Sequence, residues 1–364
     1  MSNQSAELSD VWYSLAGPDN DVVLSTRIRL ARNLVNFPFP QGFKNNDGER
    51  VLSLVFDAFS KVDENDSYQS LLISELDILG QKILSERGII EPDAISQNDS
   101  GLVWRADGRL SCTVNCNDHI RLSSFSTGLN IDYGYSLVKE IDEKIQTHLQ
   151  IAGSNEFGYL TSSIKDAGSG MKISLLIHLP AITYSGMIER VFKEVMSEGF
   201  SVSGFYGSGM EVGSSLGAIY IISTENSFSE NEETQIEKIN NLGKKIIDFE
   251  RKVRAEIADN KPTFVRDLVY KAIAIVKYSR FIETREGIDL ISKIKFGLDL
   301  GLLSGVENNM MFSLLYRTQN SHLTYVIRSS NLSYEKDVNT EELKIERLRS
   351  LILQESLTTL QVNA

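Results

Sequence analysis

The chain has 364 residues, of which 41% are hydrophobic and 24% charged, a composition typical of a globular protein large enough for two domains. Its net charge of −12 excludes broad nucleic-acid binding, because such binding depends on neutralising phosphates with Lys and Arg. No apolar run approaches the roughly 20 residues that span a bilayer, and residues 1–5 lack the basic-then-apolar order of a secretory signal. We therefore expect a cytoplasmic protein with neither nucleic acid nor membrane as a partner.

The first patterned segment is the apolar and basic run Leu24–Leu30. If this run is extended, Arg27 and Arg29 emerge on the same face, because side chains alternate along a strand. Three further segments are typical of β-strands: Leu110–Leu122, Lys172–Leu179 and Ala218–Ser223. A helix is expected over Ser185–Glu198. The glycine motifs of Rossmann and P-loop nucleotide folds are both absent from the sequence, which disfavours those folds.

Strand periodicity divides Leu110–Leu122 into two faces. The polar face carries Asn115, Asn117, His119 and Arg121. The apolar face carries Cys112, Val114, Cys116, Ile120 and Leu122. The apolar face is expected to join the core and the polar face to point away from it. The two cysteines are the only ones in the chain, and with four histidines they are too few for a zinc motif, so we expect buried, unpaired thiols and no metal site.

A charged helix follows, opened by a capping box at residues 229–232. Its apolar residues recur every three or four positions and predict packing against the sheet: Ile236, Ile239, Leu242, Ile246, Phe249, Val253 and Ile257. From about residue 260 onward the pattern is helical, with helices expected over Val265–Arg280, Thr284–Leu300 and Thr340–Leu360. The connection Asn320–Asn331 is expected to be a loop or an extended segment.

Several motifs resemble those of one enzyme family. Val114–Leu122, Val-Asn-Cys-Asn-Asp-His-Ile-Arg-Leu, resembles the signature strand of the ATP:guanidino phosphotransferases, in which Asn-Glu-Glu-Asp-His-Ile/Leu-Arg is usual. Residues 23–40 resemble the nucleotide motif of the bacterial protein-arginine kinases. Residues 158–180 resemble their substrate loop and its trailing strand, and residues 204–220 their second active-site loop. The motifs occur in family order over nearly the whole chain.

The resemblance implies an α+β fold, in which an antiparallel sheet flanked by helices forms a catalytic domain of the phosphagen kinase, or glutamine synthetase-like, type. We expect this domain over residues 1–258 and a helical domain for dimerisation and phosphoarginine sensing over residues 259–364. The implied activity transfers the γ-phosphoryl group of Mg-ATP to arginine side chains of proteins. The implied partners are arginine-containing protein substrates, a zinc-containing activator, a Clp-type unfoldase and a second copy of the chain.

The resemblance also implies roles for single residues. ATP would be held by cationic and imidazole side chains: Arg27, Arg29, Arg121, Lys172 and His119. The guanidine site would contain Asn117, Ser163 and Ser208, with Glu211 as a substitute carboxylate. Asp118 and Glu225 are further carboxylates in the motif region. In the C-terminal region, residues 345–352 resemble a phosphoarginine-sensing helix, with Glu346 and Arg349 matching in type and Ile345 in place of an arginine.

Several positions depart from the family pattern. Cys116 and Asn117 stand where two glutamates are usual, and Ser208 where a third is expected. Ser163 replaces a cysteine, and Lys172 and Ser203 replace phosphate-binding arginines. A guanidinium is protonated up to about pH 12, so its activation requires a proton acceptor. A missing general base costs about 10²–10⁴ in rate, and a missing transition-state arginine about 10³–10⁵.

Three functions are left open. The first is an impaired protein-arginine kinase. The second is a pseudokinase that binds nucleotide or arginine and acts as a regulator or adaptor. The third is a small-molecule guanidino kinase, disfavoured because the chain lacks the N-terminal helical domain of those enzymes and has an additional C-terminal one.

Overall fold

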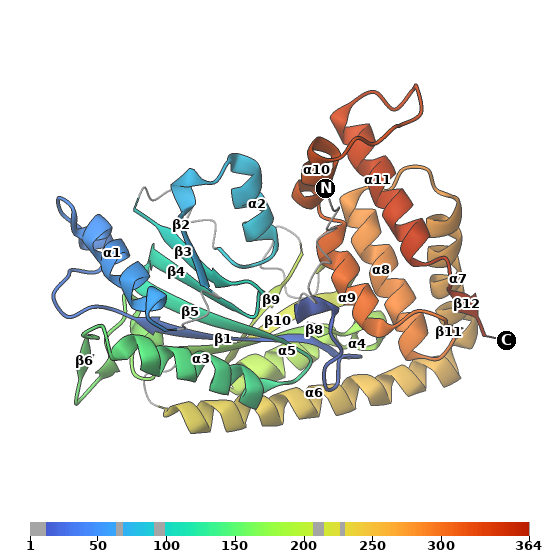
Figure 1. The fold of residues 1–364 in the computed structure, drawn as a ribbon. Helices are drawn as coiled ribbons and strands as arrows, with labels where there is room; N and C mark the ends of the chain where they lie inside the picture. The colour runs from blue at the N-terminus through green and yellow to red at the C-terminus, as the bar shows by residue number, and fades with distance from the viewer. Residues whose placement is uncertain (1–11, 63–67, 91–98, 207–214, 226–229, 364) are drawn as a thin grey trace.

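A computed structural model describes residues 12–62, 68–90, 99–206, 215–225 and 230–363. Its main feature is an eight-stranded sheet followed by a helical region (Figure 1). The strands are β1 Val23–Arg32, β2 Tyr68–Leu72, β3 Gly101–Arg105, β4 Leu110–Cys116, β5 Asp118–Thr127, β6 Gly153–Ser154, β7 Gly158–Tyr159, β8 Met171–His178, β9 Phe200–Gly204, β10 Ile219–Thr224, β11 Leu303–Ser304 and β12 Gln361–Val362. The α-helices are α1 Asp47–Ser60, α2 Ile78–Glu86, α3 Ile131–Gln146, α4 Pro180–Tyr184, α5 Ile188–Ser197, α6 Glu232–Asn260, α7 Pro262–Tyr278, α8 Thr284–Asp299, α9 Asn308–Arg317, α10 Asn320–Ser329 and α11 Glu341–Ser356.

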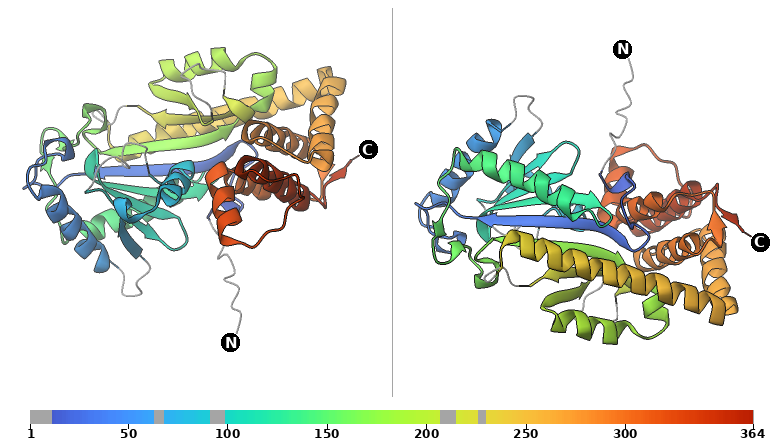
Figure 2. Two further views of the ribbon diagram at one scale, coloured as in Figure 1. Left: turned by 90° about the horizontal axis from the view of Figure 1, so that it is seen from above. Right: turned by 90° about the horizontal axis from the view of Figure 1, so that it is seen from below.

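The large sheet has the strand order β2-β3-β4-β5-β1-β8-β10-β9, and its neighbouring strands pair antiparallel. The expected α+β fold with an antiparallel sheet is therefore confirmed. Helices α3 and α6 lie across one face of the sheet, as the view from below shows (Figure 2). Within the described residues, no helix combines the length and the apolar character needed to cross a membrane.

The two faces of the sheet differ in chemistry. Ile28 of β1 lies opposite Ser124 of β5 and Ile173 of β8 on the face that packs against α3 and α6. On the other face, Arg29 lies opposite Ser123 of β5 and Lys172 of β8. Because side chains alternate along a strand, Arg27 and Arg29 share this second face, as the sequence predicted.

The segment Leu110–Leu122 is not one strand, and that prediction is wrong. It forms the antiparallel strands β4 and β5, with Cys116 paired to Asp118 across a turn at Asn117. Asn117 has a φ of 73° and Asn115 a φ of 60°, a left-handed conformation that asparagine adopts more readily than most residues. The assignment of Asn117 to a strand face therefore fails.

The turn also separates the two cysteines. Both are buried and unpaired, as expected. Cys112 belongs to the main hydrophobic core, whereas Cys116 packs in a small separate cluster with Ile73, Ile90 and Leu102. The expectation that both cysteines face the same core is wrong, because the left-handed backbone at Asn115 interrupts the alternation of side chains.

A buried carboxylate fixes the loop that faces this turn. Asp118, with no exposed surface, accepts hydrogen bonds at Oδ1 from Asn33 Nδ2 and from the backbone N–H of Ser162, both at 2.8 Å, and at Oδ2 from Arg121 Nε at 3.2 Å. We call Asp118, Asn33, Arg121 and Ser162 the Asp118 cluster. Ser162 also donates its hydroxyl to the carbonyl oxygen of Asn117. The loop 160–166 is thereby held against the β4–β5 turn.

The helical region agrees with the sequence except at two places. The apolar stripe of α6 is mostly buried, as expected. The N-cap residue of α6 is Asn231, whose Oδ1 accepts from the N–H of Thr234; Ser229 lies outside the described residues. The expected loop Asn320–Asn331 contains helix α10, with Leu323 buried. The boundary at residues 258/259 falls within the last turn of α6 and stays a prediction.

Buried polar groups join the helical region to the sheet. Lys295 of α8 donates to the carbonyl oxygen of Asp21 at 3.1 Å, just before β1. Glu250 of α6, with no exposed surface, accepts from the backbone N–H groups of Ala181 and Ile182, both at 3.0 Å, at the start of α4. Burial raises the pKa of Glu250 to about 7. This carboxyl group is therefore sensitive to pH near neutrality.

Replacing Asp118 tests the cluster. Asp118→Asn places an N–H₂ group against donors, and we expect it to lower the free energy of unfolding by about 3 kcal/mol. Asp57→Asn is the control, because Asp57 forms an exposed ion pair with Lys61, and it should cost less than about 1 kcal/mol. Urea unfolding measures both. Equal effects of the two variants would contradict a structural role for Asp118.

Glu250 gives a pH dependence of known sign. Its pKa is about 7 in the folded protein against an ordinary value of 4.5, so between these values the folded state retains a proton that the unfolded state releases. This group therefore makes the free energy of unfolding fall as pH rises from about 4.5 to 7. Glu250→Gln removes the titration, so its stability relative to wild type should increase between about pH 5 and 8 in urea unfolding. A stability difference that is constant over this range would refute the prediction.

Candidate functional site

Four cationic side chains gather on one face of the central strands. Arg29 lies directly opposite Lys172, and Arg121 lies opposite Ala31, one step further along β1 on the same face. Arg27 precedes Arg29 by two residues. We call Arg27, Arg29, Arg121 and Lys172 the cation face. Side chains directly opposite on antiparallel strands have Cβ atoms about 4.5–5.5 Å apart, so these like charges lie close enough to attract a polyanion.

Hydroxyl, aromatic and acidic groups hold the arginines in place. Arg27 donates to Ser123 Oγ at 3.2 Å, and its guanidinium carbon lies 5.3 Å from the centre of the Phe125 ring. Arg121 pairs with Asp118, as described above. Arg29 Nη2 lies 3.4 Å from Asp166 Oδ2, in the loop 160–166. The guanidinium groups of the cation face therefore have defined partners within the protein.

Serine hydroxyls extend the same face toward the sheet edge. Ser174 of β8 and Ser223 of β10 lie opposite each other, with their Oγ atoms 2.8 Å apart. Ser203 of β9, where the family pattern has an arginine, is exposed on this face, opposite Ile221. The face thus offers hydroxyl groups, which donate and accept hydrogen bonds, beside the positive charges of the cation face.

His119 differs from its expected role as a nucleotide contact. Its Nδ1 accepts from the N–H of Leu34 at 2.9 Å, so Nε2 carries the proton and donates to the carbonyl oxygen of Pro38 at 2.8 Å. The ring is fully buried and stacks on Phe43, and burial lowers its pKa. A ring without exposed surface does not reach a ligand, so His119 fixes the segment that follows β1.

Two of the predicted guanidine-site residues lie on adjoining segments. Asn117 forms the β4–β5 turn, and Ser163 follows Ser162, which bonds to that turn. The carbonyl oxygen of Ser163 accepts from Thr161 Oγ1 at 2.7 Å and from the N–H of Asp166 at 3.0 Å, which closes the loop on itself. Ser208 and Glu211 lie outside the described residues. The turn and the loop 160–166 therefore face each other beside the cation face.

Two features of this site were missed in the sequence. Asn115 and Asn117 flank a single residue and precede an aspartate, and asparagines at this spacing are typical of a turn. Asp166 lies in a segment that is rich in serine and glycine, residues typical of a loop in which a polar side chain can contact a neighbouring strand. Neither feature follows from strand periodicity.

Arg349, one of the residues expected to sense phosphoarginine, forms internal hydrogen bonds. Arg349, 1% exposed, donates to the carbonyl oxygens of Thr318 at 2.8 Å and Ile282 at 2.7 Å, and to Asn320. Burial lowers the pKa of its guanidinium to about 10. Arg349 therefore ties α11 to the rest of the helical region and has almost no surface left for a ligand.

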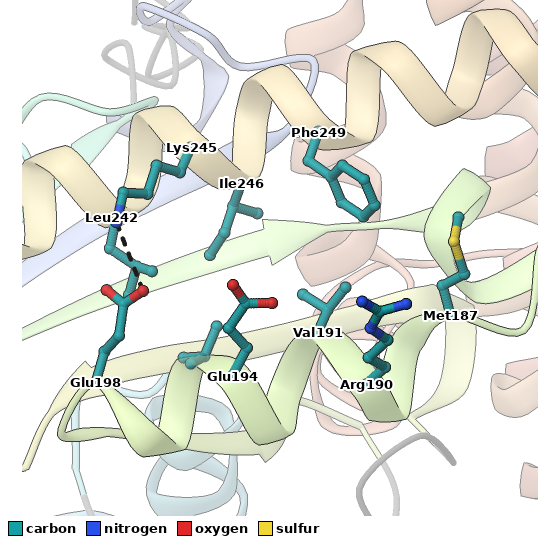
Figure 3. A pocket seen from close by; sticks show the side chains of 10 residues that line it. Met187, Arg190, Val191, Glu194, Glu198, Leu242, Lys245, Ile246 and Phe249 are labelled. Carbon is teal, nitrogen blue, oxygen red and sulfur yellow. Dashed lines mark ion pairs between the residues drawn. The ribbon is translucent and has the colours of Figure 1, made fainter.

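A separate pocket of about 460 Å³ lies between α5 and α6 (Figure 3). Val191, Ile246 and Phe249 contribute apolar surface, and Lys245 pairs with Glu198 at 3.5 Å near one end. These helices belong to the layer on the other side of the sheet from the cation face. The pocket is therefore distinct from the candidate site.

Two family models match the chain. Residues 50–253 match the model described as ATP:guanido phosphotransferase, C-terminal catalytic domain, and residues 262–364 match the model described as Protein-arginine kinase McsB C-terminal domain. The two matches meet near the end of α6, where the sheet-containing part of the chain gives way to the helical region.

Sequence relatives cover nearly the whole chain. The protein-arginine kinase of Geobacillus sp. (strain WCH70) is 31% identical over 341 residues, 93% of each chain. That of Caldanaerobacter subterraneus subsp. tengcongensis is 32% identical over 327 residues, 89% of this chain and 96% of the relative.

Solved structures share the fold at lower identity. Lombricine kinase has a TM-score of 0.56 at 19% identity, covering 67% of this chain and 71% of its own. The substrate-free duplicated taurocyamine kinase from Schistosoma mansoni has a TM-score of 0.58 at 17% identity, covering 78% and 42%. With a family model over more than half of its length and relatives of 31–32% identity over about nine-tenths of it, the chain belongs to the ATP:guanido phosphotransferase family.

Proposed function

We propose that the chain transfers the γ-phosphoryl group of Mg-ATP to arginine side chains of proteins. The cation face carries this proposal, because four positive charges on one sheet face suit a triphosphate. The relatives named protein-arginine kinase support arginine as the acceptor. The match of residues 262–364 supports a protein rather than a small-molecule acceptor.

The cation face would act by neutralising charge. In phosphoryl transfer the transition state is loose and spreads negative charge over oxygens, so positioning and neutralisation set the rate. Arg27, Arg29 and Arg121 would donate paired hydrogen bonds to phosphate oxygens, and Lys172 would act as a point charge. Mg²⁺ is bound largely through phosphates and water. It would be held with the nucleotide.

The acceptor would bind between the turn and the loop. The oxygens of Asn117 and Ser163 can accept hydrogen bonds from a guanidinium, but an amide and a hydroxyl take up no proton at neutral pH. Transfer therefore needs a carboxylate within reach. Glu211 is one candidate for this carboxylate, and Ser208 is a further candidate residue of the guanidine site.

Binding without turnover is the second candidate function. Asn117 and Ser203, which stand where a glutamate and an arginine are usual, favour it, because each change removes a charge that catalysis uses. Such a pseudokinase would bind nucleotide or arginine and act as a regulator or adaptor. For either function, the resemblance favours a cytoplasmic homodimer that works with a zinc-containing activator and a Clp-type unfoldase.

A transfer assay separates the two functions. With Mg-ATP and a denatured arginine-rich protein, we expect acid-labile phosphoarginine by mass spectrometry, and we expect Arg29→Ala to lower the rate about 10³-fold. Arg328→Ala is the matched control, because Arg328 pairs with Glu341 at 2.9 Å on the surface of the helical region, and should leave the rate unchanged. Absence of phosphoarginine would contradict the transfer proposal. If the protein then still melts at a higher temperature with Mg-ATP, the binding function is supported.

Restoring a glutamate at the turn tests the acceptor site. We expect Asn117→Glu to raise the rate at least about tenfold, part of the 10²–10⁴ that a general base contributes. The left-handed backbone there should reduce stability by about 1 kcal/mol. Asn117→Gln has the same length and backbone cost without the charge, and it should not raise the rate. If both variants behave alike in phosphoarginine formation, position 117 does not reach the acceptor.

A further inference from the structure

Three described carboxylates lie at the cation face or beside it. Asp118 pairs with Arg121, Asp166 with Arg29, and Glu225 with Lys165. Transfer to a guanidinium requires one carboxylate that is accessible to the substrate and has acceptor capacity to spare. The three groups differ in both respects.

Asp118 and Glu225 do not meet these conditions. Asp118 has no exposed surface, and its two oxygens already accept three hydrogen bonds. A carboxylate with this many internal hydrogen bonds holds the surrounding segments in place and has no free position for a substrate. Glu225 is at the opposite extreme, since its side chain is 45% exposed and its 2.7 Å contact with Lys165 lowers its pKa. A solvated carboxylate paired with a lysine is a weak proton acceptor.

Asp166 lies between these extremes. Its side chain is 16% exposed, and its partner among the described residues is Arg29. The 3.4 Å separation is longer than the roughly 2.7–2.9 Å of a strong charged hydrogen bond. The carboxylate therefore retains acceptor capacity and has a replaceable partner.

The loop that carries Asp166 connects the turn that lacks a glutamate to the cation face. Ser162, four residues earlier, donates its N–H to Asp118 and its hydroxyl to Asn117, so the loop is anchored to the β4–β5 turn. At its other end the loop reaches Arg29, which lies opposite Lys172 on the cation face. Asp166 thus belongs to a loop that is bonded to the turn at Ser162 and to the cation face at Arg29.

We propose that Asp166 is the carboxylate that receives and deprotonates the substrate guanidinium, in place of the glutamate absent at Asn117; this inference rests on the proposed function. With nucleotide present, Arg29 turns from Asp166 to a phosphate oxygen. Asp166 then bonds the guanidinium. As the guanidine nitrogen forms its bond to the γ-phosphorus, its proton passes to Asp166. The bond from phosphorus to the β–γ bridging oxygen breaks, and ADP leaves with the electron pair.

The test measures arginine binding and transfer separately. N-acetyl-arginine methylamide is titrated calorimetrically into the full chain saturated with Mg²⁺ and a non-hydrolysable ATP analogue. Asp166→Asn should weaken arginine binding at least tenfold and lower the transfer rate by about 10²–10⁴. Binding of the ATP analogue should be unchanged or tighter, because Arg29 loses an internal competitor. Asp289→Asn, in an ion pair of α8 with Lys293, is the matched control and should change neither.

Two further variants sharpen the test. Asp166→Glu should retain part of the transfer rate, and adding Asn117→Glu to Asp166→Asn should recover activity by returning a carboxylate to the turn. Arginine binding that is unchanged in Asp166→Asn would overturn the proposal. So would loss of arginine binding in Glu211→Gln but not in Asp166→Asn, or equal weakening of nucleotide and arginine in Asp166→Asn. If wild type forms no phosphoarginine, the proposed function fails, whereas arginine binding that depends on Asp166 still supports the inferred contact.

Discussion

The site depends on one buried charge. Asp118 has no exposed surface, and an isolated carboxylate in that position would be very costly. Its donors come from the residue after β1, from β5 and from the loop 160–166, so folding must bring all three together to stabilise it. This one requirement sets the position of the arginine strand, the turn and the loop relative to one another. The Asp118 cluster therefore determines the geometry in which chemistry can occur.

The cation face adds a second constraint. Four positive side chains on neighbouring strands repel one another, and the protein carries a net charge of −12, so this positive region is local. Asp118 and Asp166 compensate part of the charge, and the ring of Phe125 and the hydroxyl of Ser123 support Arg27. A local positive region of this kind attracts anionic ligands. Under the proposed function, the ligand is the triphosphate, and its binding and the release of Asp166 are parts of one exchange.

Periodicity predicted the parts of the site that lie within regular strands. It placed Arg27 and Arg29 on one face, because β1 is continuous from Val23 to Arg32. It failed at Asn117, because alternation holds only while the backbone stays extended and Asn115 and Asn117 are left-handed. Helix α10 was missed although Leu323, Val326 and Ile327 have helical spacing, because the segment is short, with 10 residues, and rich in polar residues. Asp166 depends on contacts between distant segments, which no local pattern encodes.

The change at position 117 has a different meaning in a turn than in a strand. The side chain of a strand residue points to one face of the sheet. If such a residue loses its carboxylate, its neighbours on the strand point to the other face and do not replace it. A turn borders the loop 160–166, and Ser162 holds the two segments together. Under the proposed function the acceptor binds between these two segments, and the reaction requires a carboxylate on only one of them. A glutamate absent from the turn and an aspartate on the loop fit a proton acceptor that has moved across the site. In that case position 117 can have an asparagine, which suits the left-handed backbone of the turn, while Asp166 accepts the proton of the guanidinium.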